Sequence, residues 1–351
     1  MTTIRAFILL FSLIGIVPDA LPQEFSEVTA ESRLQFPRDL YHNSAYRVQW
    51  WYFTGHLFDA GGREFGYELT FFVVGVQKRD YSSQFGVSTI YISHFAVSDI
   101  QDRKFLFHER ADAGAYGFAG ARSDRLHVWV GASSLEGSME KMQLKASGER
   151  HALELTLTPL KPLVLHGEQG YSRKSRASPL IASYYFSYPR LAAEGTLRIG
   201  SATFTVSGTS WFDRELSSRG LDAGKAGWDW FSLQLDDGRD VMLYLIRNRD
   251  GSHDPYSSGT LVYPDGSYRH LAKKEFTIKT LRHYTSEKTG ARYPAQWEIA
   301  LPAERLALTV TPLIEDQEVL STKTTRNYYW EGACTVTGNA TGRAYVELVG
   351  Y

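Results

Sequence analysis

The sequence has very little cysteine. Among its 351 residues only Cys334 carries a thiol, so no disulfide can form within the chain. That excludes the disulfide frameworks on which small secreted domains depend. A single cysteine within an apolar run is typical of a small buried side chain, and we expect Cys334 to be one.

Several chemical signatures are also absent. There is no Gly-x-Ser-x-Gly elbow, which excludes the nucleophile of an α/β-hydrolase. None of the ten histidines is spaced as His-x-His or His-x-x-x-His, so no metal site is indicated, and His94 and His108 are expected to be satisfied strand or turn residues. No glycine loop opens a helix to cradle a phosphate or a dinucleotide. The sequence therefore predicts no cofactor.

An excess of charge of one sign is missing too. The 38 basic residues nearly balance the 39 acidic ones, giving a net charge of −1, and the basic residues are scattered. This balance does not favour nucleic acid or an acidic membrane surface as a partner.

The first 20 residues are typical of an export signal. Arg5 supplies a positive start, residues 6–17 are apolar, and Pro18-Asp19-Ala20 precedes the expected cleavage. We expect a periplasmic or secreted protein whose N-terminal extension covers residues 21–35. An uncleaved membrane anchor is the lesser alternative, because the apolar run is shorter than the roughly 20 residues of a bilayer span.

Helical periodicity is almost absent from the remaining chain. Short alternating runs are separated by turn residues such as Gly61-Gly62 and Asp265-Gly266, and 14% of the residues are aromatic. These features predict an all-β protein. Its length predicts two domains, over residues 36–195 and 196–351.

Residues 161–179 interrupt the strand pattern. The segment contains Gly167, Gly170 and the basic run Arg173-Lys174-Ser175-Arg176. We expect an exposed, flexible loop that trypsin cleaves first.

Residues 208–250 combine tryptophans with acids at strand spacing. Alternation places Trp211, Asp213 and Glu215 on one face of a strand and Arg214 on the other. In the next run Trp228 and Trp230 share a face. Because pocket walls are mostly apolar with a few polar groups, we expect residues 211–244 to line the functional cavity.

The order of several blocks resembles the AttH-like family, which includes hydroxyneurosporene synthase, the carotenoid 1,2-hydratase. The blocks include QWWYFTGHL, FGYELTFF, ASYYFSYPRL, GTSWFDREL, GWDWFSLQLDDGRDVMLYLIR and YYWEGACTVTGNATGRAYVELVGY. The resemblance covers roughly residues 36–351 and implies two lipocalin-like antiparallel β-barrels side by side. Where members of the family often read W-x-D-H-x-W, this chain has Arg214 in place of the histidine and Leu216 in place of the second tryptophan. Where an acid often precedes the WWY block, this chain has Gln49. Both changes are expected to affect proton-handling groups of a hydratase.

Two functions remain open at this point. The first is an exported protein that binds a lipophilic molecule, isoprenoid, carotenoid or fatty-acid-like, in an aromatic-lined barrel cavity and contacts membranes for ligand exchange. The second is a carotenoid 1,2-hydratase-like hydro-lyase that adds water to an isoprenoid double bond without a cofactor. Protonating such a bond needs a strong donor and an aromatic wall that stabilises the cation.

The candidate residues follow from these requirements. Proposed catalytic residues are Asp213, Glu215 and Tyr244, and proposed ligand-binding residues are Trp211, Arg214, Trp228, Trp230, Trp50 and Tyr52. We expect Arg214 to bind an acidic end of the ligand, because a guanidinium binds carboxylate well. The alternatives are a salt-bridge cluster of Asp213, Arg214 and Glu215 and a core role for the Trp50-Trp51-Tyr52 block.

Overall fold

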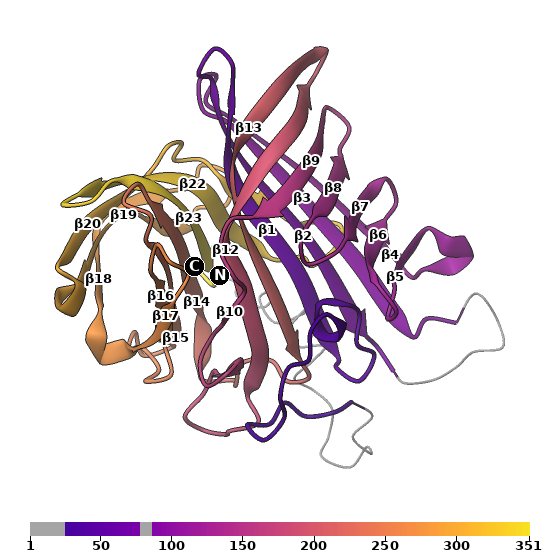
Figure 1. Cartoon of the computed structure of the whole chain (residues 1–351), viewed down its shortest axis with the longest axis horizontal. Coiled ribbons are helices and arrows are strands. Elements are labelled where there is room, and N and C mark those ends of the chain that lie inside the picture. Colours follow the sequence, from indigo (N-terminus) through magenta and orange to yellow (C-terminus); the bar gives the residue numbers. More distant parts are fainter. Residues whose placement is uncertain (1–24, 78–85) are drawn as a thin grey trace.

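The chain is nearly all β, as its alternation predicts. The computed structural model describes residues 25–77 and 86–351, and within them the helical elements are four short 3₁₀ turns. These are η1 (Arg38–Leu40), η2 (Ala115–Gly117), η3 (Lys273–Glu275) and η4 (Pro302–Glu304). The strands form two curled, barrel-like antiparallel sheets side by side, so the predicted pair of lipocalin-like barrels is confirmed (Figure 1).

The first sheet holds thirteen strands. They are β1 (Val48–Asp59), β2 (Glu64–Gly75), β3 (Thr89–Asp99), β4 (Lys104–Asp112), β5 (Ala119–Ala121), β6 (Leu126–Val130), β7 (Ser133–Gly137), β8 (Met142–Ser147), β9 (His151–Pro159), β10 (Val164–Leu165), β11 (Tyr171–Arg173), β12 (Ala182–Ile199) and β13 (Ala202–Ser217). Their order is β4-β3-β2-β1-β13-β12-β9-β8-β7-β6-β5, with β10 and β11 paired to β12.

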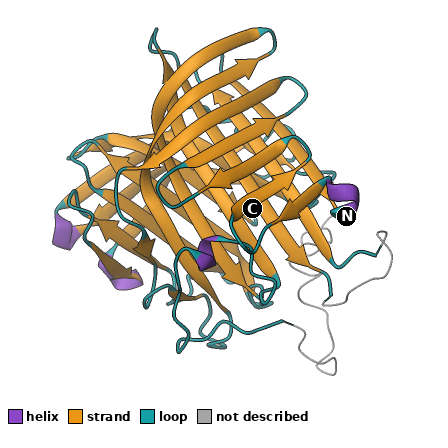
Figure 2. Cartoon of the chain, turned by 45° about the vertical axis from the view of Figure 1, so that its right-hand side comes forward, coloured by secondary structure: helices purple, strands orange, loops and turns teal. Residues whose placement is uncertain are grey.

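The second sheet holds ten strands. They are β14 (Lys225–Leu235), β15 (Asp240–Asn248), β16 (Ser258–Val262), β17 (Tyr268–Ala272), β18 (Thr277–Thr285), β19 (Arg292–Leu301), β20 (Leu306–Pro312), β21 (Glu318–Leu320), β22 (Tyr328–Gly338) and β23 (Gly342–Val349). Their order is β17-β16-β15-β14-β23-β22-β20-β19-β18, and β21 pairs with β22. Figure 2 shows that strands make up nearly all of both lobes.

The expected domain boundary between residues 195 and 196 is displaced in the structure. That position lies inside β12, and both β12 and β13 belong to the first sheet. β13 pairs with β1 along its length, from Val48 opposite Ser217 to Asp59 opposite Val206. The chain therefore passes to the second sheet between β13 and β14, over residues 218–224.

The strands in the middle of the molecule are buried on both faces, whereas outer strands such as β9 are buried on one face. β9 alternates buried and accessible residues, because one of its faces meets the barrel core and the other meets solvent. β1, β13, β14 and β15 instead contain long buried runs. Their inner faces fill the two barrels with apolar cores, and their outer faces meet the opposite sheet. Cys334 is fully buried in the second barrel, as predicted.

Polar contacts also join the two sheets. His56 Nε2 of β1 lies 2.9 Å from the carbonyl oxygen of Ala344 in β23. Arg343 of β23 donates from Nε to Glu64 Oε1 of β2 at 2.6 Å. The outer faces of the barrels thus form one continuous interface in the middle of the molecule.

The expected export signal over residues 1–20 lies outside the described residues. Within the described part of the chain, no helix has the length and apolar character that a membrane span requires.

Candidate functional site

A pocket lies between the two sheets rather than inside either barrel. Its walls are the outer faces of strands β1, β2, β12 and β13 on one side and β14, β15, β22 and β23 on the other. Its aromatic lining consists of Trp50, Tyr52, Phe72, Tyr185, Trp228, Trp230, Tyr244 and Tyr329, and its other titratable side chains are His94, Lys174, Asp213, Glu215, Arg219, Glu331 and Glu347. The expectation of a cavity within a barrel is corrected, because apolar side chains fill both barrels.

Strand register gathers the pocket side chains into one row on each sheet. In the first sheet Tyr52 of β1 lies opposite Asp213 of β13. In the second sheet Trp230 of β14 lies between Glu347 of β23 and Tyr244 of β15. Directly paired residues of antiparallel strands project from the same face, so each row presents a carboxyl group beside aromatic rings.

Asp213 is closely held by hydrogen-bond donors. Its Oδ1 accepts from Trp211 Nε1–H at 2.6 Å and from the Ser187 hydroxyl, and its Oδ2 accepts from the Tyr185 hydroxyl at 2.6 Å. Only 4% of the residue is exposed. Burial raises the pKa of Asp213 to about 7, with a further contribution from Glu215, although the three donors act in the opposite direction.

Glu347 reaches the pocket from the opposite sheet. It is half-buried, and Trp228 Nε1–H donates to its Oε2 at 3.0 Å. Burial raises the pKa of Glu347 to about 7, and the negative charges of Asp213 and Glu215 add to the shift. Two carboxyl groups on facing sheets therefore hold protons close to neutral pH, and they repel each other when both are ionised.

Glu331 and Glu68 extend the acidic region beyond Glu347. Burial, reinforced by the neighbouring carboxyl groups, raises the pKa of both well above the ordinary value. The Tyr52 hydroxyl lies beside Glu331, and this contact opposes the rise in the pKa of the Glu331 carboxyl. Buried carboxyls in such surroundings are neutral, so this end of the pocket is polar without being strongly charged.

Lys174 supplies a positive charge to the pocket. Its Nζ lies 3.3 Å from Glu215 Oε1, and 4.8 Å and 4.4 Å from the ring centres of Tyr185 and Tyr244. Burial opposes its charge, but Glu215 and Tyr244 outweigh burial and raise the pKa of Lys174. Glu215 is thus the partner of a cation, whereas Asp213 has no such ion pair within 4 Å among the described residues.

Lys174 belongs to residues 161–179, which we call the strap. Lys161 Nζ forms a buried ion pair with Asp240 Oδ2 at 2.6 Å, and β11 pairs with β12. Lys161, His166 and Ser175 are buried. The expectation of an exposed loop is therefore corrected, since strand pairing and ion pairs attach the strap to both sheets.

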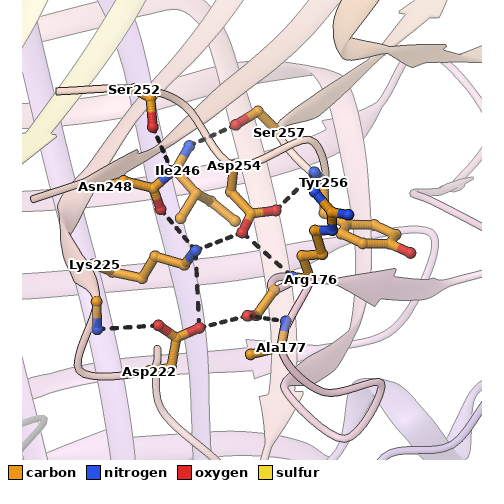
Figure 3. A network of polar contacts seen from close by, with 12 residues as sticks. Arg176, Ala177, Asp222, Lys225, Ile246, Asn248, Ser252, Asp254, Tyr256 and Ser257 are labelled. Carbon is orange, nitrogen blue, oxygen red and sulfur yellow. Dashed lines mark hydrogen bonds and ion pairs between the residues drawn. The ribbon is translucent and has the colours of Figure 1, made fainter. Parts of the chain in front are cut away.

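Figure 3 shows the network that fastens the second half of the strap. Lys225 Nζ lies 2.5 Å from Asp254 Oδ2 and 3.8 Å from Asp222 Oδ2. The backbone N–H of Arg176 donates to Asp254 Oδ2 at 3.3 Å, and the Ser175 hydroxyl donates to Asp222 Oδ2. Because Lys225 and Asp254 belong to the second sheet and its loops, the network fixes Lys174 between the two halves.

Most residues predicted from the sequence line this pocket: Asp213, Glu215, Tyr244, Trp228, Trp230, Trp50 and Tyr52. Trp211 lies behind the wall, where it donates to Asp213 and packs edge-on against Trp230 with ring centres 6.1 Å apart. Within the block of three aromatics, Trp51 is in the barrel core while its two neighbours face the pocket.

Sequence reasoning missed Lys174, Glu331 and Glu347. Lys174 belongs to the segment that the sequence predicts to be an exposed, flexible loop. A feature of the sequence that could have identified the two glutamates is a single acid within an apolar strand. Glu331 is that acid in YYWEGA, and Glu347 is that acid in AYVELV. Such a charge needs either a partner or a function.

The described residues contain no group of three or more His, Cys, Asp and Glu side chains placed to hold a metal ion.

The family model described as AttH-like matches residues 27–351. The chain belongs to the AttH-like family.

Solved structures agree with this membership. A crystal structure from Nitrosomonas europaea, assigned as AttH, has 32% sequence identity and a TM-score of 0.85, and the match covers 93% of this chain and 100% of that one. Kievitone hydratase from Nectria haematococca has 14% identity and a TM-score of 0.70, over 93% of this chain and 97% of its own. At that identity the likeness shows a common fold. The search of curated proteins found no match.

In this AttH-like protein Arg214 does not belong to the pocket. It is fully buried, donates from Nη2 to Gln49 Oε1 at 2.8 Å and to the Tyr41 carbonyl at 2.7 Å, and lies 3.8 Å over the Trp51 ring. Strand alternation turns it away from Asp213, so Arg214 lies outside the pocket in which we expected it to bind an acidic ligand. Gln49 and Arg214, the departures from the family pattern, contact each other inside the first barrel.

Proposed function

We propose that this AttH-like protein is a cofactor-independent hydro-lyase that adds water to a carbon–carbon double bond of a lipophilic molecule, isoprenoid, carotenoid or fatty-acid-like. The observation that carries the proposal is the pair Asp213 and Glu347. The two carboxyls come from facing sheets, line one aromatic pocket and each have a pKa of about 7. Carboxyls tuned to neutral pH suit general acid and base catalysis.

The hydrogen bonds assign the two roles. Asp213 accepts from three donors, which favour a carboxylate, whereas among the described residues Glu347 accepts from Trp228 Nε1–H. Since repulsion disfavours ionising both, we assign the proton that remains near neutral pH to Glu347. Glu347 then gives that proton to an alkene carbon, and Asp213 removes a proton from the water that attacks the resulting cation.

The aromatic lining supports the same reaction. Trp228 and Trp230 share a face of β14, and Trp50 lines the pocket from the first sheet. The π faces of such rings stabilise a developing carbocation, and their apolar surface suits a long hydrocarbon. Kievitone hydratase, which shares the fold, is named as a hydratase, and this supports the proposed reaction class.

A binding protein without turnover is the second candidate. It is favoured by the ion pair between Lys174 and Glu215, which offsets the positive charge of Lys174. We further propose, from Arg5 and the apolar run over residues 6–17, that the protein works in the periplasm or outside the cell.

The test uses the purified full chain, acyclic isoprenoids, carotenoids and unsaturated fatty acids in heavy-oxygen water, and mass spectrometry. We expect an alcohol carrying the heavy oxygen, and a loss of rate of at least about 100-fold in both Glu347→Gln and Asp213→Asn. Glu298→Gln, at an exposed strand position, is the control. Retained ligand with no alcohol from any compound would favour the binding protein instead.

A further inference from the structure

We infer that His166 is a positioning residue for Asp213: it changes tautomer, through Ser187, whenever Asp213 gains or loses a proton. The inference rests on the proposed function, in which Asp213 receives a proton from water. The sequence pattern predicts no role for His166. The residue lies on the strap, behind the pocket wall.

A chain of hydrogen bonds connects the two residues. The Ser187 hydroxyl lies between Asp213 Oδ1 and His166 Nε2, at 2.6 Å from the latter. On the far side of the ring, His166 Nδ1 lies 2.8 Å from Thr260 Oγ1 in the second sheet. Both ring nitrogens of the 1% exposed histidine therefore meet a hydroxyl, which can donate or accept.

Among the donors to Asp213, Ser187 is the one for which the described part of the chain offers a second acceptor, His166 Nε2. The Trp211 N–H can only donate, and the Tyr185 hydroxyl oxygen already accepts from Trp230 Nε1–H at 2.9 Å. For Tyr185 the described residues offer no acceptor other than Asp213. Ser187 alone can turn its hydrogen away, towards His166 Nε2.

This geometry defines two complete hydrogen-bond patterns. With Asp213 ionised, Ser187 donates to Oδ1, His166 Nε2–H donates to Ser187, and Thr260 donates to Nδ1. With Asp213 protonated, Oδ1–H donates to Ser187, Ser187 donates to Nε2, and Nδ1–H donates to Thr260. In both patterns the hydrogens of Asp213, Ser187 and His166 are paired, whereas a proton on Oδ2 would have no acceptor among the described side chains, because the Tyr185 oxygen already accepts from Trp230.

The ring stays neutral in both patterns. Burial, followed by the nearby positive charge of Lys174 on the strap and by His270 on β17, lowers the pKa of His166 well below its usual value. The Tyr185 ring packs against it with centres 4.2 Å apart. The charged groups facing Asp213 are Glu215, Glu347 and Lys174. His166 therefore responds to the proton on Asp213 by moving its hydrogen from one nitrogen to the other, without ionising.

His94 provides an internal comparison. Its Nε2 lies 2.8 Å from Thr324 Oγ1, and the Thr324 hydroxyl donates to Glu109 Oε2 at 2.5 Å. Donors from Thr324 and Ser321 overcome burial and lower the pKa of Glu109, which therefore stays ionised. Thr324 must then accept from His94 Nε2–H, and the Tyr329 hydroxyl donates to Nδ1 at 2.8 Å. This histidine has one tautomer at neutral pH.

The experiment is nitrogen-15 NMR of the histidine-labelled full chain from pH 5.5 to 8.5, without ligand. We expect His166 to carry its hydrogen on Nδ1 at the acidic end and on Nε2 at the basic end, with a midpoint near pH 7, while His94 keeps Nε2–H throughout. Asp213→Asn should hold His166 as Nε2–H at every pH, because Trp211 and Ser187 then face the amide oxygen. Ser187→Ala should also abolish the change, and it serves if the first variant does not fold.

A His166 signal that keeps one tautomer, that becomes imidazolium, or that still switches in Asp213→Asn would overturn the inference. The measurement is independent of turnover. A switching His166 in a protein that hydrates nothing would refute the proposed function alone, and a static His166 in an active hydratase would refute the tautomer switch alone.

Discussion

Asp213→Asn should change how the stability of the protein depends on pH. The pKa of Asp213 is raised from 3.8 to about 7, so between these values the folded protein binds more protons than the unfolded chain. Stability from this group is fully present below pH 3.8 and is lost as pH rises through about 7. A shift of about 3 units is worth about 4 kcal/mol at 1.36 kcal/mol per unit.

Part of this loss of stability already occurs at acidic pH. About 1.5 kcal/mol is lost by pH 5, which leaves about 3 kcal/mol between pH 5 and pH 9. The asparagine does not titrate. It also leaves the Tyr185 hydroxyl without its acceptor, which costs about 1 kcal/mol at every pH. The variant should therefore be slightly less stable than the native chain near pH 4, and more stable at pH 9.

This difference in stability can be measured by urea unfolding from pH 4 to pH 9, followed by tryptophan fluorescence. The free energy of unfolding of the native protein should fall more steeply with pH than that of Asp213→Asn, and Glu298→Gln should follow the native curve. Parallel curves for the native chain and Asp213→Asn would refute the raised pKa and, with it, the acid–base role of this carboxyl.

Two further predictions concern the surroundings of the pocket. Arg214→Ala should destabilise the protein by about 3 kcal/mol or more in urea unfolding, because it leaves the buried Gln49 oxygen and Tyr41 carbonyl with fewer donors, while the affinity for any pocket ligand stays within a few-fold of native. Weakened ligand binding at unchanged stability would contradict that placement. Asp222→Ala should speed tryptic cleavage within the strap, because the contact with Ser175 and the contact with Lys225 seen in Figure 3 are lost. Glu315→Ala, which removes an exposed ion pair, should not. Equal cleavage rates in the two variants would show that the network does not hold the strap.

The sequence was sufficient for the fold class and for one wall of the pocket. Alternation in β13 correctly separates Asp213 and Glu215 from Arg214, because neighbouring residues of a strand project from opposite faces. The expectation that Arg214 binds a ligand in the same pocket contradicted that same alternation. The family resemblance supplied the two barrels, which short alternating runs alone do not distinguish from other all-β folds.

The opposite wall depends on pairings that no local pattern contains. β13 joins the first sheet by pairing with β1, more than 140 residues earlier, so the domain boundary could not be placed from neighbouring strands. Glu347 meets Asp213 only because two outer faces pack together, which is a tertiary event. Lys174 was missed because its segment is rich in glycine and basic residues, and the strap is ordered by distant partners such as Asp222 and Asp254.

A pocket built on strand faces constrains how such a protein can diversify. Many binding proteins change specificity by lengthening or replacing loops, which tolerate insertions. Here the pocket residues alternate with barrel-core residues along the same strands, as Tyr52 does with Trp51 and Phe53. An insertion of one residue would exchange the two sets, putting polar site groups into the core and core rings into the site. New specificities on this scaffold must therefore arise by replacing side chains at fixed positions, two residues apart, with the strand lengths unchanged.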